Sequence, residues 1–171
     1  MSRKLLSISD IKKLNSLLRQ VFRYIEKLKT KSTAAAWLKL PQLPSILSES
    51  LTIHLLRRGK ILPKLKNFKF DFGGRTADIL ASKNGKEVKI EIKSSAESAF
   101  EYFGEKDLSS DYLMWVHFGT FFKSTANTKF SVFIIKSPKH YFKKPVKINL
   151  SKMRERVGRS VEELKFDIRS L

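Results

Sequence analysis

The chain has 171 residues and a formal net charge of +19, from 35 Lys and Arg against 16 Asp and Glu. This length fits one domain. Apolar residues make up 42% and include 13 Phe, which is enough for a hydrophobic core and excludes a disordered chain. The lack of cysteine excludes disulfides, thiolate metal sites and Cys nucleophiles, and is compatible with a cytoplasmic location. No apolar run is long enough for a membrane span and no signal segment opens the chain, so we expect no membrane-spanning segment.

The charge is distributed unevenly along the chain. The segment from Tyr112 to Arg154 contains no acidic residue, whereas most of the carboxylates lie between Glu49 and Asp111. A compact domain with this much positive charge is expected to bind a polyanion: DNA, RNA or an anionic membrane surface. Carboxylates that gather in one segment of a basic chain are typical of metal chemistry.

Two helices are predicted in the first third of the chain. Apolar residues at helical spacing predict an amphipathic helix that begins near Ser7 or Ser9 and ends at about Lys29. A second helix is predicted to begin near Pro44 and to end at Gly59. The first helix has apolar residues to spare, and we expect it to form a dimer contact.

A β-hairpin is predicted next, after a strand-like run at residues 68–72. The segments Thr76–Ser82 and Glu87–Ser94 alternate between apolar and polar residues and are separated by Asn84-Gly85. This dipeptide favours a type I′ turn, in which both central residues have positive φ. Gly73-Gly74 is expected to make a bend before the hairpin.

The remaining elements complete an α/β pattern. Residues 96–106 are compatible with a helix broken at Gly104, residues 112–118 and 129–135 predict buried strands, and residues 151–157 predict a short helix. The predicted fold is α/β, with a central mixed sheet of about four or five strands flanked by helices. We expect a single domain, with N-terminal helices over 1–60, a sheet core over 66–135, and a basic loop and C-terminal helix over 136–171.

The polar face of the hairpin carries the residues that predict chemistry. Glu91 and Lys93 share one face of the returning strand because side chains alternate with a period of two. The hairpin brings Asp78 of the outgoing strand to the level of Glu91. Two carboxylates can hold Mg²⁺, and a nearby lysine can orient the attacking water and neutralise charge on a phosphate. The alternative interpretation is a solvated strand face, and Asp71 is a rival for the metal-binding aspartate.

Asp78 followed by Glu91-Ile92-Lys93 resembles the PD-(D/E)xK nuclease superfamily, which includes many type II restriction endonucleases. The resemblance implies that the domain is a nuclease domain with a restriction-endonuclease-like core, in which the sheet over 66–135 is catalytic. It also implies Mg²⁺-dependent DNA cleavage, with metal ligands at Asp78, at Glu91 and at the main-chain carbonyl of Ile92. Lys93 would take the role of the family's lysine, and Glu49 matches the additional Glu that many members carry on an early helix. Ala77 stands where the family motif has proline.

Several polar and basic residues are candidates for DNA contacts. The segment from Lys136 to Lys147 interleaves basic residues with Tyr141-Phe142, a pattern that suits phosphates or, alternatively, a solvated loop anchored by its two aromatic residues. The three histidines are isolated, and His117 is expected to be structural. The predicted DNA-binding residues are Ser94, Ser95, Lys136, Lys139, His140, Lys143 and Lys144.

The sequence therefore predicts a Mg²⁺-dependent, sequence-specific double-strand DNA endonuclease of the type II restriction class, acting as a homodimer. Two alternatives remain open. One is a junction-resolving, homing or repair nuclease on the same core, and the other is a non-catalytic basic protein that binds DNA or RNA.

Overall fold

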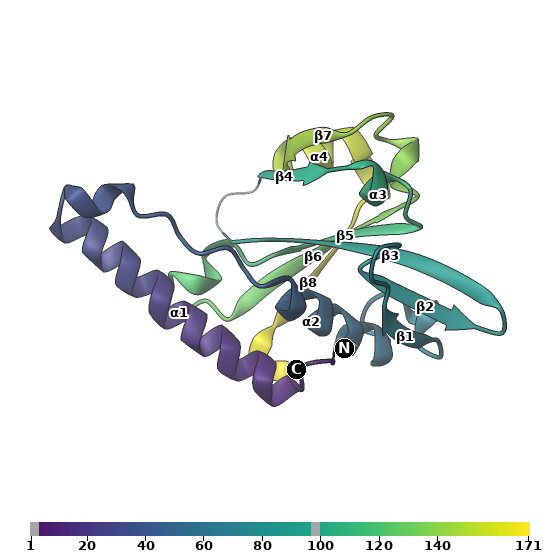
Figure 1. The fold of residues 1–171 in the computed structure, drawn as a ribbon, viewed down its shortest axis with the longest axis horizontal. Coiled ribbons are helices and arrows are strands. Elements are labelled where there is room, and N and C mark those ends of the chain that lie inside the picture. Colours follow the sequence, from purple (N-terminus) through teal and green to yellow (C-terminus); the bar gives the residue numbers. More distant parts are fainter. Residues whose placement is uncertain (1–3, 97–99) are drawn as a thin grey trace.

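A twisted six-stranded sheet forms the centre of the molecule in the computed structural model, which describes residues 4–96 and 100–171 (Figure 1). The strand order is β1-β2-β3-β5-β6-β8, and every neighbouring pair is antiparallel except β3 and β5, which are parallel. This arrangement confirms the α/β class and the mixed sheet. The strands are β1 (Lys69–Phe72), β2 (Ile79–Lys83), β3 (Lys86–Ser95), β5 (Tyr112–His117), β6 (Lys129–Lys136) and β8 (Glu162–Asp167).

The predicted hairpin is confirmed, and its turn sets the register. Asn84 and Gly85 have φ angles of 50° and 75°, as a type I′ turn requires. The turn pairs Lys83 with Lys86 and, at the far end of the hairpin, Ile79 with Ile90.

The two predicted N-terminal helices are also confirmed. Helix α1 spans Ile8–Lys31 and begins with a capping box between Ser7 and Asp10, which satisfies backbone donors at its first turn. Helix α2 spans Ser45–Arg57, and Gly59 follows it with a φ of 65°. Short 3₁₀ helices connect the larger elements: η1 (Ala34–Trp37), η2 (Pro63–Leu65), η3 (Gly119–Phe122), η4 (Pro138–His140), η5 (Gly158–Ser160) and η6 (Ile168–Ser170).

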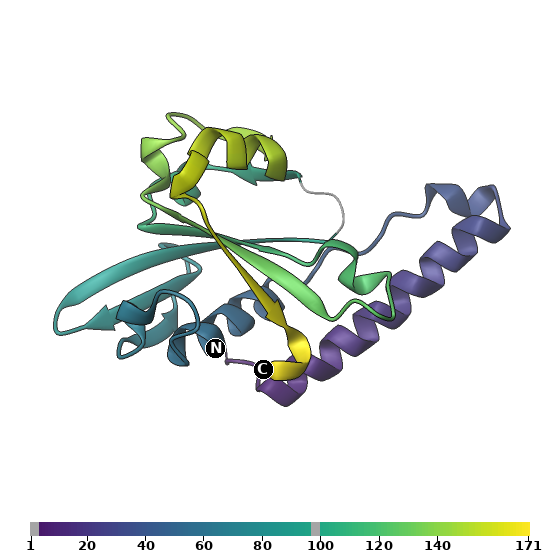
Figure 2. The same cartoon turned by 180° about the vertical axis from the view of Figure 1, so that it is seen from behind.

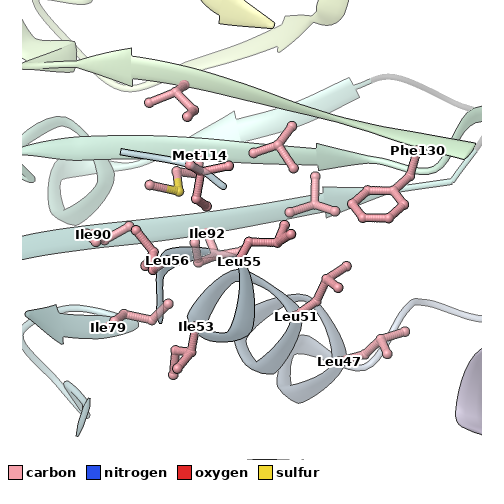
Figure 3. Packing of buried hydrophobic residues seen from close by; sticks show 14 of the residues in the cluster. Leu47, Leu51, Ile53, Leu55, Leu56, Ile79, Ile90, Ile92, Met114 and Phe130 are labelled. Atoms are coloured by element: carbon pink, nitrogen blue, oxygen red, sulfur yellow. The ribbon is translucent and has the colours of Figure 1, made fainter. Parts of the chain in front are cut away.

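One face of the sheet packs against α1 and α2. Figure 3 shows Leu51 and Leu55 of α2 directed at Ile90, Ile92 and Met114 of the sheet, and all five side chains are buried. The even-numbered residues of β3 therefore face α2, so Glu91 and Lys93 face the opposite side.

The opposite face is covered by a smaller layer, seen above the sheet in Figure 1. It contains a two-stranded antiparallel sheet of β4 (Phe100–Phe103) and β7 (Val146–Asn149), with helices α3 (Glu105–Leu108) and α4 (Leu150–Val157). Its aromatic residues form a second core, in which Phe103 contacts Trp115 and Phe142 edge-on, with ring centroids 5.9 and 5.3 Å apart.

This layer corrects two predictions. The helix expected over residues 96–106 is wrong, because 100–103 form β4 and only Glu105–Leu108 are helical (residues 97–99 lie outside the described part). Pairing with β7 overrides the local pattern. The main sheet also exceeds the expected four or five strands, because the mostly polar segment 162–167 pairs along β6 as an edge strand.

The parallel pairing of β3 with β5 determines what covers Glu91 and Lys93. Two parallel neighbours require a crossover on one face of the sheet. Here that connection contains β4 and α3, so α3 lies over the face that carries Glu91 and Lys93 (Figure 1).

The chain ends close to where it starts. Figure 2 shows the edge strand β8 leading the C-terminus to the beginning of α1. Lys12 donates from Nζ to the carbonyl oxygens of Arg169 and Leu171, at 3.3 and 3.1 Å. Within the two described ranges, no helix is both long and apolar enough to cross a bilayer.

Candidate active site

Asp78 and Glu91 lie opposite each other at the open end of the hairpin. The last paired residues are Ile79 and Ile90, so Asp78, one residue before β2, stands at the level of Glu91. Because β2 begins only at Ile79, the N–H of Ile92 has no strand partner on this side, and it donates to Asp78 Oδ2 at 2.8 Å. The carbonyl of a strand residue points to the same side as its N–H, so the Ile92 carbonyl is directed to the side of Asp78.

Glu91 is a buried carboxylate with an unsatisfied oxygen. The residue is 2% exposed, and its Oε1 has no hydrogen-bond donor. Lys106 Nζ lies 3.2 Å from this oxygen, an ion-pair distance without hydrogen-bond geometry, and 3.0 Å from Asp78 Oδ1. Burial and the charge of Asp78 raise the pKa of Glu91 to about 7, although Lys106 acts in the lowering direction. Burial opposes the charged form of Lys106, but the two carboxylates raise its pKa overall.

Lys93 lies on the same face and has its own carboxylate partner. Its Nζ is 2.9 Å from Asp107 Oδ2, and Asp107 also accepts a hydrogen bond from the N–H of Gly104 at 2.7 Å. Glu101 of β4 interacts electrostatically with both Lys93 and Asp107. Burial raises the pKa of Glu101 to about 7, with Lys93 lowering it and Asp107 raising it. The face of β3 is therefore covered by a network of alternating charges.

The pair of Asp78 and Glu91 fits a divalent cation with few protein ligands. Across the described residues, no three His, Cys, Asp or Glu side chains come together as a group that could hold a metal ion. Mg²⁺, however, keeps several of its waters and is commonly held by one or two carboxylates. Within the described part of the chain, the buried Oε1 of Glu91 has no hydrogen bond and is paired with the Lys106 ammonium alone, so it is already an oxygen that faces a cation.

Two other candidate carboxylates lie apart from this pair. Glu49 is buried on α2, which packs against the opposite face of the sheet; among the described residues it does not form a metal-binding group with Asp78 and Glu91, and its catalytic role stays a prediction. Asp71 is exposed on β1 and forms an ion pair with Lys69 at 2.8 Å. The geometry thus favours Asp78 over Asp71.

The serines after Lys93 differ in what they can contact. Ser95 is buried, accepts a hydrogen bond from Trp115 Nε1 at 2.7 Å and lies 3.0 Å from His117 Nδ1. Its hydroxyl is thus engaged inside the protein, and its DNA-binding role stays a prediction. Burial lowers the pKa of His117, in agreement with the structural role expected of it. Ser94 is partly exposed and borders a cavity.

That cavity lies at the end of β3, beside the candidate site. It has a volume of about 510 Å³, and its walls come from the segment Leu40–Leu43, the end of β3 at Ser94–Ala96, and Phe100 and Glu101 of β4. Glu101 lines this cavity and also interacts electrostatically with Lys93 and Asp107, so the cavity adjoins the charged network.

The predicted basic DNA contacts are exposed but do not form one surface with the serines. Lys139, His140, Lys143 and Lys144 lie on η4 and the loop after it, which is anchored by the fully buried Phe142. Lys136 pairs with Tyr112 at the start of β5, whereas Ser95 pairs with His117 at its end. A second cavity of about 400 Å³ adjoins Lys136. The DNA-binding role of these residues stays a prediction.

Sequence reasoning missed three members of the network: Glu101, Lys106 and Asp107. They belong to the crossover, and their distance from Glu91 along the chain hides the contact. The topology offered the only signal. If the second strand of the hairpin pairs in parallel with the next buried strand, the segment between them must cross one face of the sheet, and its residues can then cover Glu91.

No protein family model, curated protein or solved structure matches this chain.

Proposed function

We propose that the protein is a Mg²⁺-dependent DNA endonuclease whose metal is held by Asp78, Glu91 and the main-chain carbonyl of Ile92. The observation that supports this most directly is the juxtaposition of two carboxylates, Asp78 and the buried Glu91, at one end of the hairpin, where the ammonium of Lys106 lies within 3.2 Å of both. Burial of an ionisable group without full satisfaction costs stability, and such groups concentrate at functional sites.

The residues of this chain have distinct tasks in the proposed reaction. Asp78 and Glu91 hold the cation, which supplies Lewis-acid stabilisation of the charge that develops on the phosphate. Lys93, two residues after Glu91 on the same face, donates to a phosphate oxygen or orients the attacking water. The net charge of +19 attracts the DNA, so binding weakens steeply with salt.

We further propose the type II restriction class, which acts on a specific double-stranded site as a homodimer. Helix α1 supports the dimer because Leu17, Val21 and Tyr24 are large apolar side chains about half exposed on its surface. A two-fold dimer would place one active site on each DNA strand. The cysteine-free sequence permits a cytoplasmic location, where such an enzyme would meet DNA.

The test is cleavage of a large mixed-sequence DNA by the intact protein, with Mg²⁺ and with EDTA. We expect discrete fragments that require Mg²⁺ and disappear in Asp78→Asn and Glu91→Gln. Asp71→Asn, which removes an exposed carboxylate of the same sheet, is the matched control and should cut normally. Lys93→Ala should lose cutting, with Lys89→Ala, an exposed lysine of β3, as its control.

The outcomes separate the alternatives. Fragments of random length would remove the sequence-specific class and leave a nuclease, and cutting confined to branched substrates would identify a junction-resolving enzyme. Salt-sensitive DNA binding without cutting of any substrate would contradict the proposal and leave a non-catalytic DNA-binding protein.

A further inference from the structure

Helix α3 supplies a counter-ion to each charged residue of the candidate site. Lys106 pairs with both Asp78 and Glu91, and its neighbour Asp107 pairs with Lys93. Three charges on the hairpin are thus neutralised by two consecutive residues of a four-residue helix. The counter-ions are not residues of the hairpin, because Lys106 and Asp107 belong to the crossover between β3 and β5.

The ammonium of Lys106 contacts both carboxylates of the proposed metal site. Asp78 Oδ2 accepts a hydrogen bond from the N–H of Ile92, whereas Asp78 Oδ1 and Glu91 Oε1 both lie against the ammonium of Lys106. Lys106 Nζ is 3.0 Å from the first and 3.2 Å from the second. A cation bound to both oxygens would approach each to about 2.0–2.1 Å, which leaves no room for an ammonium group between them.

Lys106 is able to leave this position without disturbing the core. Its side chain is 40% exposed, and it extends from a surface helix that is held by other contacts. Asp107 caps that helix through the N–H of Gly104, and the buried Leu108 anchors it in the second hydrophobic core. Rotation of one long side chain into solvent therefore opens the two carboxylates, while α3 stays in place.

We infer that Lys106 is a built-in competitor for the metal, so that a divalent cation binds Asp78 and Glu91 only when the Lys106 ammonium withdraws. This inference rests on the proposed function, because it concerns the same site. When a binding-competent state is only partly populated, the apparent affinity falls by that fraction. Lys106 thus lowers the metal affinity of the resting protein and balances two carboxylates that would otherwise repel each other.

The test is calorimetric titration of the full-length, metal-free protein with Mg²⁺ and with Mn²⁺, without DNA. Lys106→Met keeps the length of the side chain and removes its charge, and Lys106→Gln is a second, more polar variant. We expect both to bind the cation at least about tenfold more tightly than the wild type. Lys89→Met removes an exposed lysine of β3 and should leave the affinity unchanged. Adding Glu91→Gln to Lys106→Met should abolish the gain.

The outcomes distinguish this inference from the proposed function. Equal or weaker binding by both Lys106 variants would overturn the competition and leave the nuclease intact. Absence of specific binding by any of the proteins would overturn both.

A measurement on the wild type keeps the inference testable if the variants do not fold. The Nζ resonance of Lys106 in ¹⁵N-lysine-labelled protein, assigned with Lys106→Arg, should move towards that of a solvent-exposed lysine as Mg²⁺ is added. A resonance that stays unchanged at saturating Mg²⁺ would overturn the competition.

Discussion

Replacing Glu91 by Gln should stabilise the metal-free protein at neutral and alkaline pH. Glu91 is 2% exposed, and burial together with the charge of Asp78 raises its pKa from 4.5 to about 7. Gln has nearly the same shape and carries no charge, so the variant removes the cost of an ionised buried carboxylate. This cost is what a functional site pays in stability.

The sign and the pH window follow from linkage. Between pH 4.5 and about 7 the folded protein retains a proton on Glu91 that the unfolded chain has lost, so the free energy of unfolding decreases as pH rises through this window. The full interval corresponds to about 3 kcal/mol, at about 1.4 kcal/mol per pH unit. Gln imitates the protonated acid, so we expect Glu91→Gln to gain up to about 3 kcal/mol above this window.

Urea unfolding in EDTA, followed by the fluorescence of the buried Trp115, measures this effect. The gain should be near zero at about pH 4.5 and largest at about pH 8. Glu87→Gln neutralises an exposed carboxylate of the same strand and should show little dependence on pH. A gain that is the same at both pH values, or a less stable variant at pH 8, would refute the account of Glu91 as a strained buried acid.

The remaining predictions concern the core and the DNA surface. Ser95→Ala should lower the free energy of unfolding by about 1–3 kcal/mol, because it leaves the buried Nε1–H of Trp115 without an acceptor; an unchanged urea midpoint would contradict this. Replacing both of the exposed residues Lys143 and Lys144 by Gln should weaken DNA binding. It should also reduce the slope of log K against log salt by about 2. A slope equal to that of the wild type would exclude contacts from this loop to phosphates.

The elements that sequence reasoning predicted correctly carry local signals. Helix α1 has its capping box and apolar stripe, and the hairpin has its Asn84-Gly85 turn, so both are specified by residues close together in the chain. Strands β4 and β8 lack such signals, since both are short and largely exposed and depend on partners distant in sequence, β7 and β6. Their pairing is a tertiary property, which local patterns do not encode.

For the candidate site, the sequence by itself determined that Asp78, Glu91 and Lys93 share one end and one face of a hairpin, because the turn and the two-residue period of a strand require it. Only the tertiary structure decided what these charges meet. The parallel pairing of β3 and β5 forces the crossover over this face, and thereby brings Lys106 between the two carboxylates and Asp107 to Lys93. Contacts of this kind depend on how separate segments pack, so they become visible only once the whole chain is folded.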